Sequence, residues 1–321
     1  MAVLLVIMQV TACGGEEREP SPSATATPPS GSPASASTAL SPEAAAGGAI
    51  PIGKIAFVSR RDGNSEIYLT RAVGGETNLT NNPAEDIDPD WSPDGSKLVF
   101  SSDRDGDYEI YVANADGSGV RRLTNSPTAD FSPRWSPDGS RIAFSRQGTI
   151  VIIGSDGSNP GPITEPQAEA TAPPCQGPAF LGGWSPDGER LTFHSASGSR
   201  GIAEVCTVKV DGSDLRVVVS DPATYHEEPS WSPDGQHIVY RSIREGKHYI
   251  YVVEPDGSSE TRLTDGAAID MEPGWSPDGQ WIVFSSDRQG TFEMFIMRAD
   301  GSDLLQITDS RAKNSNPSWG P

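Results

Sequence analysis

The chain has 321 residues, and its 35% hydrophobic residues together with 34 glycines are enough for a buried core, which excludes global disorder. It carries 44 acidic and 24 basic residues, whereas a protein that binds nucleic acid or an anionic membrane needs the opposite balance. Four histidines and three cysteines leave little room for a zinc cluster.

The first segment, residues 2–10, is an apolar run that is too short to span a bilayer and is typical of a secretion signal. Small residues then precede Cys13, and this pattern resembles the lipobox of bacterial lipoprotein signal peptides. The resemblance implies a signal peptide over residues 1–12 and a lipid on Cys13. We therefore expect an exported chain whose lipid anchors it in the bacterial cell envelope, in the periplasm or on the outer face of the membrane.

Residues 13–50 follow as a stretch of Ser, Thr, Ala, Pro and Gly without apolar periodicity. Such a segment cannot offset the entropy of ordering, so we predict a disordered tether between the lipid and a folded domain.

From residue 51 the chain repeats. The pentapeptide Trp-Ser-Pro-Asp-Gly begins at Trp91, Trp135, Trp184, Trp231 and Trp275, and a truncated copy begins at Trp319. A period of about 45 residues is typical of β-propeller blades. We interpret these tryptophans as anchors for blade packing and not as platforms for sugar binding.

Each unit predicts four strands, with a turn at Ser-Pro-Asp-Gly and a hairpin at a later Asp-Gly. The strands are apolar on both faces, as in Lys97–Ser102, which suits sheets packed between neighbouring sheets. The chain begins this pattern with a second strand at Ile55 and ends it with a first strand at Trp319. Pairing the two closes an all-β ring of six four-stranded antiparallel blades over residues 51–321.

These motifs and their spacing resemble the TolB-like propeller repeats of bacterial envelope proteins, over residues 54–321. TolB itself carries an α/β domain before its propeller, where this chain has the tether. The resemblance therefore implies an exported, non-catalytic propeller that binds other molecules, and it does not imply the partners of TolB itself.

The approach to each tryptophan should line the mouth of the central channel, because the first strand of a blade is innermost. Residues five and three before the tryptophans would point the same way in an extended strand. The candidate binding residues at these positions are Asp86, Asp88, Asp130, His226, Glu228, Asp270 and Glu272. An alternative is that this ring serves to hydrogen-bond adjacent blades.

Two ligands suit such a ring. It would attract a basic peptide or protein of the envelope, which we favour, or it would hold a hard cation such as calcium. The acidic run Asp103–Asp107 lacks the spacing and terminal glutamate of a calcium loop, so we interpret it as a polar hairpin loop and expect no cofactor. We expect a monomer that contacts the membrane through its lipid alone.

One approach loop, Glu165–Gly183, is longer than the others and is a candidate specificity element. It contains Cys175, while Cys206 stands where other blades place an aromatic residue. With Cys13 lipidated, these two cysteines are the remaining pair in an exported protein, so we hypothesise a disulfide between them. The alternative is a buried thiol at Cys206 and an unrelated thiol in the loop.

The sequence contains no nucleophile elbow, Walker motif or dinucleotide fingerprint. Of the four histidines, we expect His226 alone to reach the channel mouth. A propeller enzyme of the lyase or lactonase type, acting on a carbohydrate or lactone with His226 beside Glu227 and Glu228, is therefore the alternative function.

Overall fold

The computed structural model describes residues 53–71, 74–163, 175, 177–197 and 202–321, and every regular element among them is a strand. None of these described segments is a helix with the length and hydropathy needed to cross a bilayer. The predictions for the signal peptide, for Cys13 and for the tether concern residues outside the described part of the chain.

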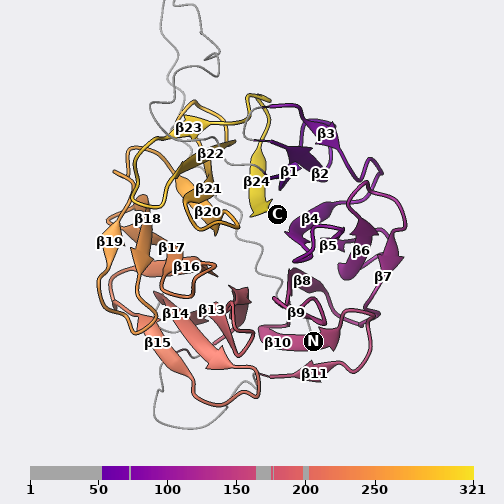
Figure 1. Cartoon of the computed structure of the whole chain (residues 1–321), viewed down its shortest axis with the longest axis horizontal. Coiled ribbons are helices and arrows are strands. Elements are labelled where there is room, and N and C mark those ends of the chain that lie inside the picture. The colour runs from indigo at the N-terminus through magenta and orange to yellow at the C-terminus, as the bar shows by residue number, and fades with distance from the viewer. Residues whose placement is uncertain (1–52, 72–73, 164–174, 176, 198–201) are drawn as a thin grey trace, which may run out of the picture. The chain divides into compact units, whose positions relative to one another are not determined.

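The described strands form six four-stranded antiparallel blades, which Figure 1 shows arranged around a central axis. The innermost strand of each blade ends at a repeat tryptophan: β4 (Asp86–Trp91), β8 (Asp130–Trp135), β12 (Ala179–Trp184), β16 (Tyr225–Trp231), β20 (Asp270–Trp275) and β24 (Asn314–Trp319). The second strands are β1 (Ile55–Ser59), β5 (Lys97–Ser102), β9 (Arg141–Arg146), β13 (Arg190–Ser197), β17 (Ile238–Arg244) and β21 (Trp281–Ser286).

The third and fourth strands form the outer part of each blade. The third strands are β2 (Glu66–Thr70), β6 (Glu109–Asn114), β10 (Thr149–Gly154), β14 (Ile202–Lys209), β18 (Lys247–Val253) and β22 (Glu293–Arg298). The fourth strands are β3 (Thr77–Asn78), β7 (Arg121–Arg122), β11 (Gly161–Pro162), β15 (Arg216–Val219), β19 (Thr261–Arg262) and β23 (Leu305–Gln306). Apart from β15, each of the fourth strands has two residues, which keeps the exposed sheet edges short.

The last strand completes the first blade, as the sequence predicts. Strand β24 pairs antiparallel with β1, with Trp319 opposite Ile55 and Asn314 opposite Ser59. We number the blades from this one, so that blade 1 holds β24 and β1–β3 and blade 4 holds β12–β15. The backbones of blades 4 and 5 also pair at one position, where Ala203 of β14 lies parallel to Tyr225 of β16.

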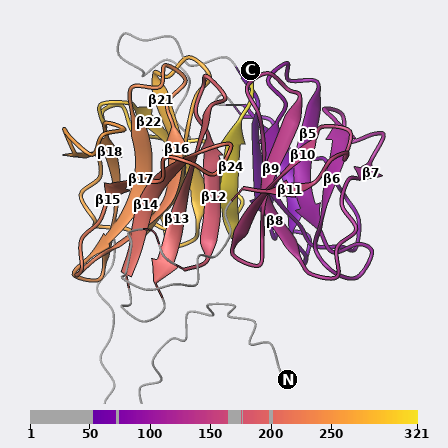
Figure 2. The ribbon, with the colours of Figure 1, turned by 90° about the horizontal axis from the view of Figure 1, so that it is seen from below.

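The hydrophobic core of the described residues lies between blades, as six clusters that each join two neighbouring sheets. Each cluster contains or contacts one repeat tryptophan, for example Trp91 between blades 1 and 2 and Trp184 between blades 3 and 4. These two indoles are 7% exposed, so the prediction that the tryptophans anchor blade packing is confirmed. In the side view of Figure 2 the C-terminus lies at one face of the ring. This is the face of the Trp-Ser-Pro turns, because Pro321 contacts Gly95, and we call it the tryptophan face.

Candidate functional site

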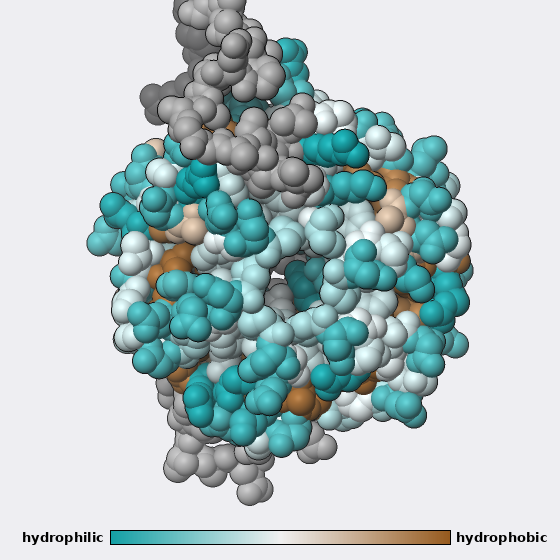
Figure 3. Space-filling model, viewed as in Figure 1, coloured by the Kyte–Doolittle hydropathy of each residue, from teal (hydrophilic) through white to brown (hydrophobic). Residues whose placement is uncertain are grey.

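A cavity of about 540 Å³ lies on the axis of the ring, and Figure 3 shows the ring hollowed at its centre. Part of its wall comes from residues three before the repeat tryptophans: Asp88, Ser132, Leu181, Glu228, Glu272 and Asn316. A second part comes from residues one before them: Asp90, Arg134, Gly183, Ser230, Gly274 and Ser318. The tryptophans and the Ser-Pro turns complete the wall, so the cavity reaches toward the tryptophan face.

A β-bulge in the inner strands decides which side chains reach this cavity. In β4 the register with β5 shifts between Ile87 and Asp90, and Asp88 has a φ of 53°. The same left-handed conformation recurs at Ser132, Glu228, Glu272 and Asn316, with φ between 50° and 57°. A bulge inserts an extra residue and breaks the alternation of side chains. The expectation that residues five and three before the tryptophan point the same way is therefore wrong.

The residues five before the tryptophan lie inside the sheets and not at the channel. Asp86, Asp130 and Asp270 have no exposed surface. Each carboxylate pairs with an arginine from the end of the second strand or from the loop that follows it: Asp86 with Arg104 at 2.9 Å, Asp130 with Arg146 at 2.6 Å and Asp270 with Arg288 at 2.8 Å. Burial raises the pKa of Asp130, although its bonds to Arg146 oppose that shift. The placement of these three acids at a channel mouth is thus corrected to buried ion pairs.

His226 is also buried and is absent from the wall of the cavity. Its ring has no exposed surface, its Nε2 shares a hydrogen bond of 2.6 Å with Thr224 Oγ1, and it packs edge-on against Tyr240. Burial, followed by the charge of Arg244, lowers the pKa of His226 to about 4. The alternative function, which placed His226 at the centre of a carbohydrate or lactone site, loses its proposed acid–base group.

His194 lines the cavity, so the expectation that His226 is the one histidine to reach it is wrong. It stands on β13 opposite Phe180 of β12, and the two rings stack with centroids 4.9 Å apart. Strand β12 has Gly182 and Gly183 at the positions nearest the axis, so its backbone leaves room for a side chain from the second strand. Burial lowers the pKa of His194 to about 4, and the nearby charge of Glu227 opposes that shift.

Hydrogen bonds link the bulges of successive blades around the cavity. Four of them bind a bulge N–H to a side chain of the preceding blade: Ser132 to Asp88 (3.0 Å), Glu228 to His194 Nδ1 (3.3 Å), Glu272 to Glu228 (2.6 Å) and Asn316 to Glu272 (2.7 Å). The side-chain amide of Asn316 also donates a hydrogen bond to the Asp88 carboxylate, at 3.0 Å. A bulge leaves backbone groups unpaired within the sheet, and these bonds satisfy them. The inner acids therefore join adjacent blades, which agrees with the alternative role that the sequence left open.

The same carboxylates are partly buried and lie close to one another. Burial raises the pKa of Asp88, Asp90 and Glu228. The pKa of Glu272 rises to about 8, first because of burial and then because of the charge of Glu228. Arg241 lies 3.4 Å from Glu228 and also pairs with Glu227, so it compensates part of this negative charge.

Three cavity residues, Asp90, Arg134 and His194, were missed by the sequence reasoning. A signal for the first two was present, because a proline stands two before the tryptophan in five of the six repeats, as at Pro89. Proline inside a strand is confined to edges and bulges. A bulge at this point moves the residue before the tryptophan to the axis, which places Asp90 and Arg134 there. His194 had no such signal, because it depends on the glycines of the neighbouring strand.

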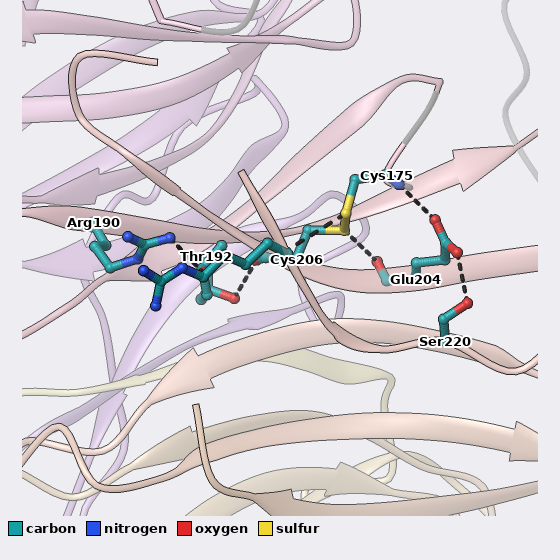
Figure 4. Close-up of a disulfide and its surroundings, with 8 residues drawn as sticks. Cys175, Arg190, Thr192, Glu204, Cys206 and Ser220 are labelled. Atoms are coloured by element: carbon teal, nitrogen blue, oxygen red, sulfur yellow. Dashed lines mark hydrogen bonds between the residues drawn. A yellow bond between two sulfur atoms is a disulfide. The ribbon is translucent and has the colours of Figure 1, made fainter. Parts of the chain in front are cut away.

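The long approach loop is shorter than predicted at its C-terminal end, since residues 179–183 belong to strand β12. Residues 164–174 and 176 of this loop lie outside the described chain. Cys175 is described, and a disulfide joins it to Cys206 on β14, with the two Cα atoms 6.2 Å apart (Figure 4). The Cys175 N–H donates to the Glu204 carboxylate at 2.7 Å, and the Ser220 hydroxyl donates to the same carboxylate at 2.6 Å.

The carboxylates of Asp103 and Asp105, in the acidic run that the sequence predicts to be a polar loop, have partners within the protein. Asp103 accepts a hydrogen bond from the Glu85 N–H, while Asp105 accepts bonds from Tyr111 and Arg122, so the two carboxylates serve different partners. Within the described chain, the one group of three potential ligands with atoms within 4.8 Å of one another is Cys175, Glu204 and Cys206. Its two sulfurs are bonded to each other, so they do not act as thiolate ligands in this state.

The blades and the cavity define the class of this protein, a six-bladed β-propeller with a charged central cavity. The chain belongs to the TolB beta propeller domain family, whose model matches residues 41–159 and 149–321. The family resemblance predicted from the repeats is thereby confirmed.

Two curated relatives match short stretches of the chain. The Uncharacterized protein Atu1656 of Agrobacterium fabrum is 32% identical over 90 residues, which are 28% of this chain and 30% of that protein. The Tol-Pal system protein TolB of Syntrophus aciditrophicus is 40% identical over 55 residues, which are 17% of this chain and 12% of that protein. The matches thus span less than a third of the length of either relative.

Solved structures share the fold over most of this chain. TolB from Acinetobacter baumannii superposes with a TM-score of 0.72 at 18% identity, over 84% of this chain and 67% of that protein. A putative TolB from Agrobacterium tumefaciens gives a TM-score of 0.64 at 21% identity, over 84% and 99%. Oligogalacturonate lyase from Vibrio parahaemolyticus gives 0.52 at 15% identity, over 80% and 74%. At these identities the likeness concerns the fold alone.

Proposed function

We propose that this propeller is a non-catalytic binding module, which receives a peptide or protein segment with a basic side chain in its central cavity. In this proposal the chain is exported, is held in the cell envelope by the lipid on Cys13, and acts as a monomer on a protein partner there. The observation that carries the proposal is the charged cavity, because it differs from the buried acids of the sheets in having space beside its carboxylates.

The charge of the cavity favours a cationic ligand. Four wall carboxylates, those of Asp88, Asp90, Glu228 and Glu272, outnumber the wall arginine, Arg134, and Arg241, which lies 3.4 Å from Glu228, compensates part of their charge. Their raised pKa values mean that the ionised forms are poorly stabilised in the free protein. A guanidinium or ammonium group placed beside them would favour the ionised forms, so cation binding and proton release would be linked. The field would also steer a basic segment toward the ring.

The shape of the cavity favours a chain segment. Near the tryptophan face, four successive blades contribute small residues to the wall, which leaves space beside them: Gly183, Ser230, Gly274 and Ser318. A Cβ atom added at Gly183 would meet nothing within 4 Å, so a larger side chain there would extend into the cavity. The volume of about 540 Å³ lies within the roughly 300–1,000 Å³ that ligand pockets enclose.

Blocking the cavity from within tests this proposal. The full chain is titrated into fluorescent peptides of alternating Arg-Gly and alternating Glu-Gly. We expect the Arg-Gly peptide to bind, and we expect Gly183→Phe to weaken its binding about tenfold or more, equal to at least about 1.4 kcal/mol. Gly183→Ala is the matched control and should bind as the wild type does. Equal binding of both peptides, or wild-type affinity in the Gly183→Phe variant, would contradict the proposal.

A further inference from the structure

Four blades share a packing unit that we call the interlock, in which an arginine stacks on one or both rings of an aromatic pair and pairs with a carboxylate. In blades 2 and 6 this carboxylate belongs to the first residue of the inner strand. In blade 2, the Arg104 guanidinium lies 5.3 Å from the Phe100 ring and 4.8 Å from the Tyr111 ring, and it pairs with Asp86. Since the aromatic residues belong to the second and third strands and the aspartate to the first, the interlock ties three strands together.

Blade 6 repeats this unit, and blades 1 and 5 vary it. In blade 1, Arg61 stacks on Phe57 and Tyr68 and pairs with Glu76. In blade 6, Arg288 stacks on Phe284 and Phe295 and pairs with Asp270. In blade 5, Arg244 stacks on Tyr251 but pairs with Glu260, and His226 takes the place of the aspartate. The polar partner therefore varies, while the arginine and the aromatic pair remain.

Blade 4 has lost the interlock as a set. The residue five before its tryptophan is Ala179, which has no carboxylate, and the position of the arginine is occupied by Ser197. Cys206 stands opposite Phe193 in the sheet, just as Tyr111 stands opposite Phe100 in blade 2. Three of the four positions that build the interlock in blade 2 thus carry other residues in blade 4.

The disulfide occupies the vacated position. Cys206 is fully buried, and its sulfur is bonded to Cys175, which precedes the inner strand β12 in the chain. Glu204 adds a second tie between the same segments, because it accepts the Cys175 N–H. A covalent bond therefore connects the third strand to the segment that leads into the first strand. In blades 2 and 6 the arginine makes the corresponding link, because it stacks on the aromatic residue of the third strand and pairs with the aspartate of the first.

We propose that the Cys175–Cys206 disulfide replaces the interlock of blades 1, 2, 5 and 6 and makes blade 4 a redox-sensitive element of the ring. A dithiol reductant would attack the partly exposed Cys175 sulfur as a thiolate and release the Cys206 thiolate. Its second thiolate would then displace Cys175 and close a cyclic disulfide. The protein disulfide gains two electrons, the dithiol loses two, and the two thiol protons end on Cys175 and Cys206.

Reduction would loosen one blade because the non-covalent replacement is missing there. Blades 2 and 6 keep their ion pairs whatever the redox state, while in blade 4 Cys175 would be held by weaker non-covalent contacts, such as the hydrogen bond of its N–H to Glu204. This inference does not require the proposed function. If that function holds, binding would also weaken on reduction, because blade 4 contributes Leu181, Gly182 and His194 to the cavity wall.

Hydrogen exchange with mass spectrometry, on the full chain with and without dithiothreitol, tests the proposal. We expect the amides of β12, β13 and β14 to exchange about tenfold faster or more after reduction, while those of β4, β5 and β6 in the same molecule keep their rates. Unchanged exchange in blade 4, or an equal rise in blades 2 and 4, would overturn it. Intact mass in each sample establishes whether the bond is present or reduced.

Two variants separate the bond from the other effects of the reductant. Cys175→Ser should exchange in blade 4 as the reduced wild type does, without reductant, and should melt about 5 °C lower. The triple variant Ala179→Asp, Ser197→Arg and Cys206→Tyr transplants the interlock of blade 2. It should keep slow exchange in blade 4 under dithiothreitol. If the triple variant folds but exchanges in blade 4 as fast as Cys175→Ser, the disulfide does not act as a replacement for the interlock.

Discussion

Asp86 and Asp88 stand two residues apart in one strand and have different environments. Asp86 is fully buried and paired with Arg104, while Asp88 lines the central cavity and bonds the next blade. The same contrast separates Asp270 from Glu272. The difference shows that the bulge between the two positions, and not the residue type, assigns one acid to the interior of a sheet and the other to the axis.

The largest effect on stability should come from an acid that is buried inside a sheet and paired with an arginine. Asp130 bonds Arg146 through both carboxylate oxygens, at 2.6 and 2.7 Å, and has no exposed surface. Asp130→Ala leaves the guanidinium without its partner and should lower the free energy of unfolding by about 3 kcal/mol. Urea denaturation measures this change. Asp107→Ala, at an exposed acid of a neighbouring loop, is the control and should stay within about 0.5 kcal/mol of the wild type. A similar loss in both variants would contradict the structural role of Asp130.

In blade 4, two successive glycines before the repeat tryptophan, Gly182 and Gly183, extend the comparison of neighbouring positions in one inner strand. A Cβ atom on Gly182 would overlap the Pro229 carbonyl oxygen of blade 5, whereas one on Gly183 would meet nothing within 4 Å. Gly182→Ala should therefore destabilise the protein by about 2 kcal/mol through overpacking, and Gly183→Ala by less than about 0.5 kcal/mol. Thermal melting of the two variants side by side measures the difference. Equal melting temperatures would mean that blades 4 and 5 do not approach as closely as described.

The acid Glu272 of the cavity wall should make the stability of the protein depend on pH. The pKa of Glu272 is about 8 in the folded protein, against an ordinary value of 4.5. A carboxyl whose pKa is raised by folding stabilises the folded state at low pH, and this contribution is lost as the pH rises through the folded value. The groups that face Glu272 are Glu228, Arg241, Lys313 and the Asn316 N–H. The stability of the wild type relative to Glu272→Gln should therefore fall between about pH 5 and pH 8.

Urea denaturation at several pH values measures this trend. Glu189→Gln, at an exposed glutamate, is the control and should show a stability difference that does not change over the same range. A difference for Glu272→Gln that stays constant, or that rises with pH, would show that Glu272 is ionised without cost in the cavity.

The smallest effect should come from His194. Its pKa is about 4 when folded, against 6.5 ordinarily, so its contribution to stability is present above pH 6.5 and is lost as the pH falls toward 4. A protonated Nδ1 can no longer accept the Glu228 N–H. His194→Gln keeps an acceptor that does not titrate in this range. At pH 7 it should be less stable than the wild type by about 1 kcal/mol or less, and the deficit should shrink as the pH falls. A deficit that grows on acidification would contradict this role.

The sequence predicts the ring and its closure because the repeat tryptophan and the two turn motifs recur at a nearly constant spacing. It predicts less of the site, because side chains alternate between the two faces of a regular strand, whereas a bulge interrupts this alternation in the inner strands. The proline at Pro89 and its equivalents marks that bulge and would have directed attention to Asp90 and Arg134. His226 and His194 could not be distinguished in this way. Their exposure depends on packing against Tyr240 and on the glycines of β12, which are contacts between strands.

The most direct test of this account compares Asp270→Asn with Glu272→Gln in the full chain at pH 8, by urea denaturation. The two residues are neighbours on β20, and each substitution removes one charge with little change of shape. We predict that Asp270→Asn loses about 2–3 kcal/mol of unfolding free energy, because Arg288 keeps its charge without an ionic partner. Glu272→Gln should be at least as stable as the wild type, because the repulsion from Glu228 is relieved. Equal destabilisation by both substitutions would contradict the claim that the bulge gives neighbouring acids different roles.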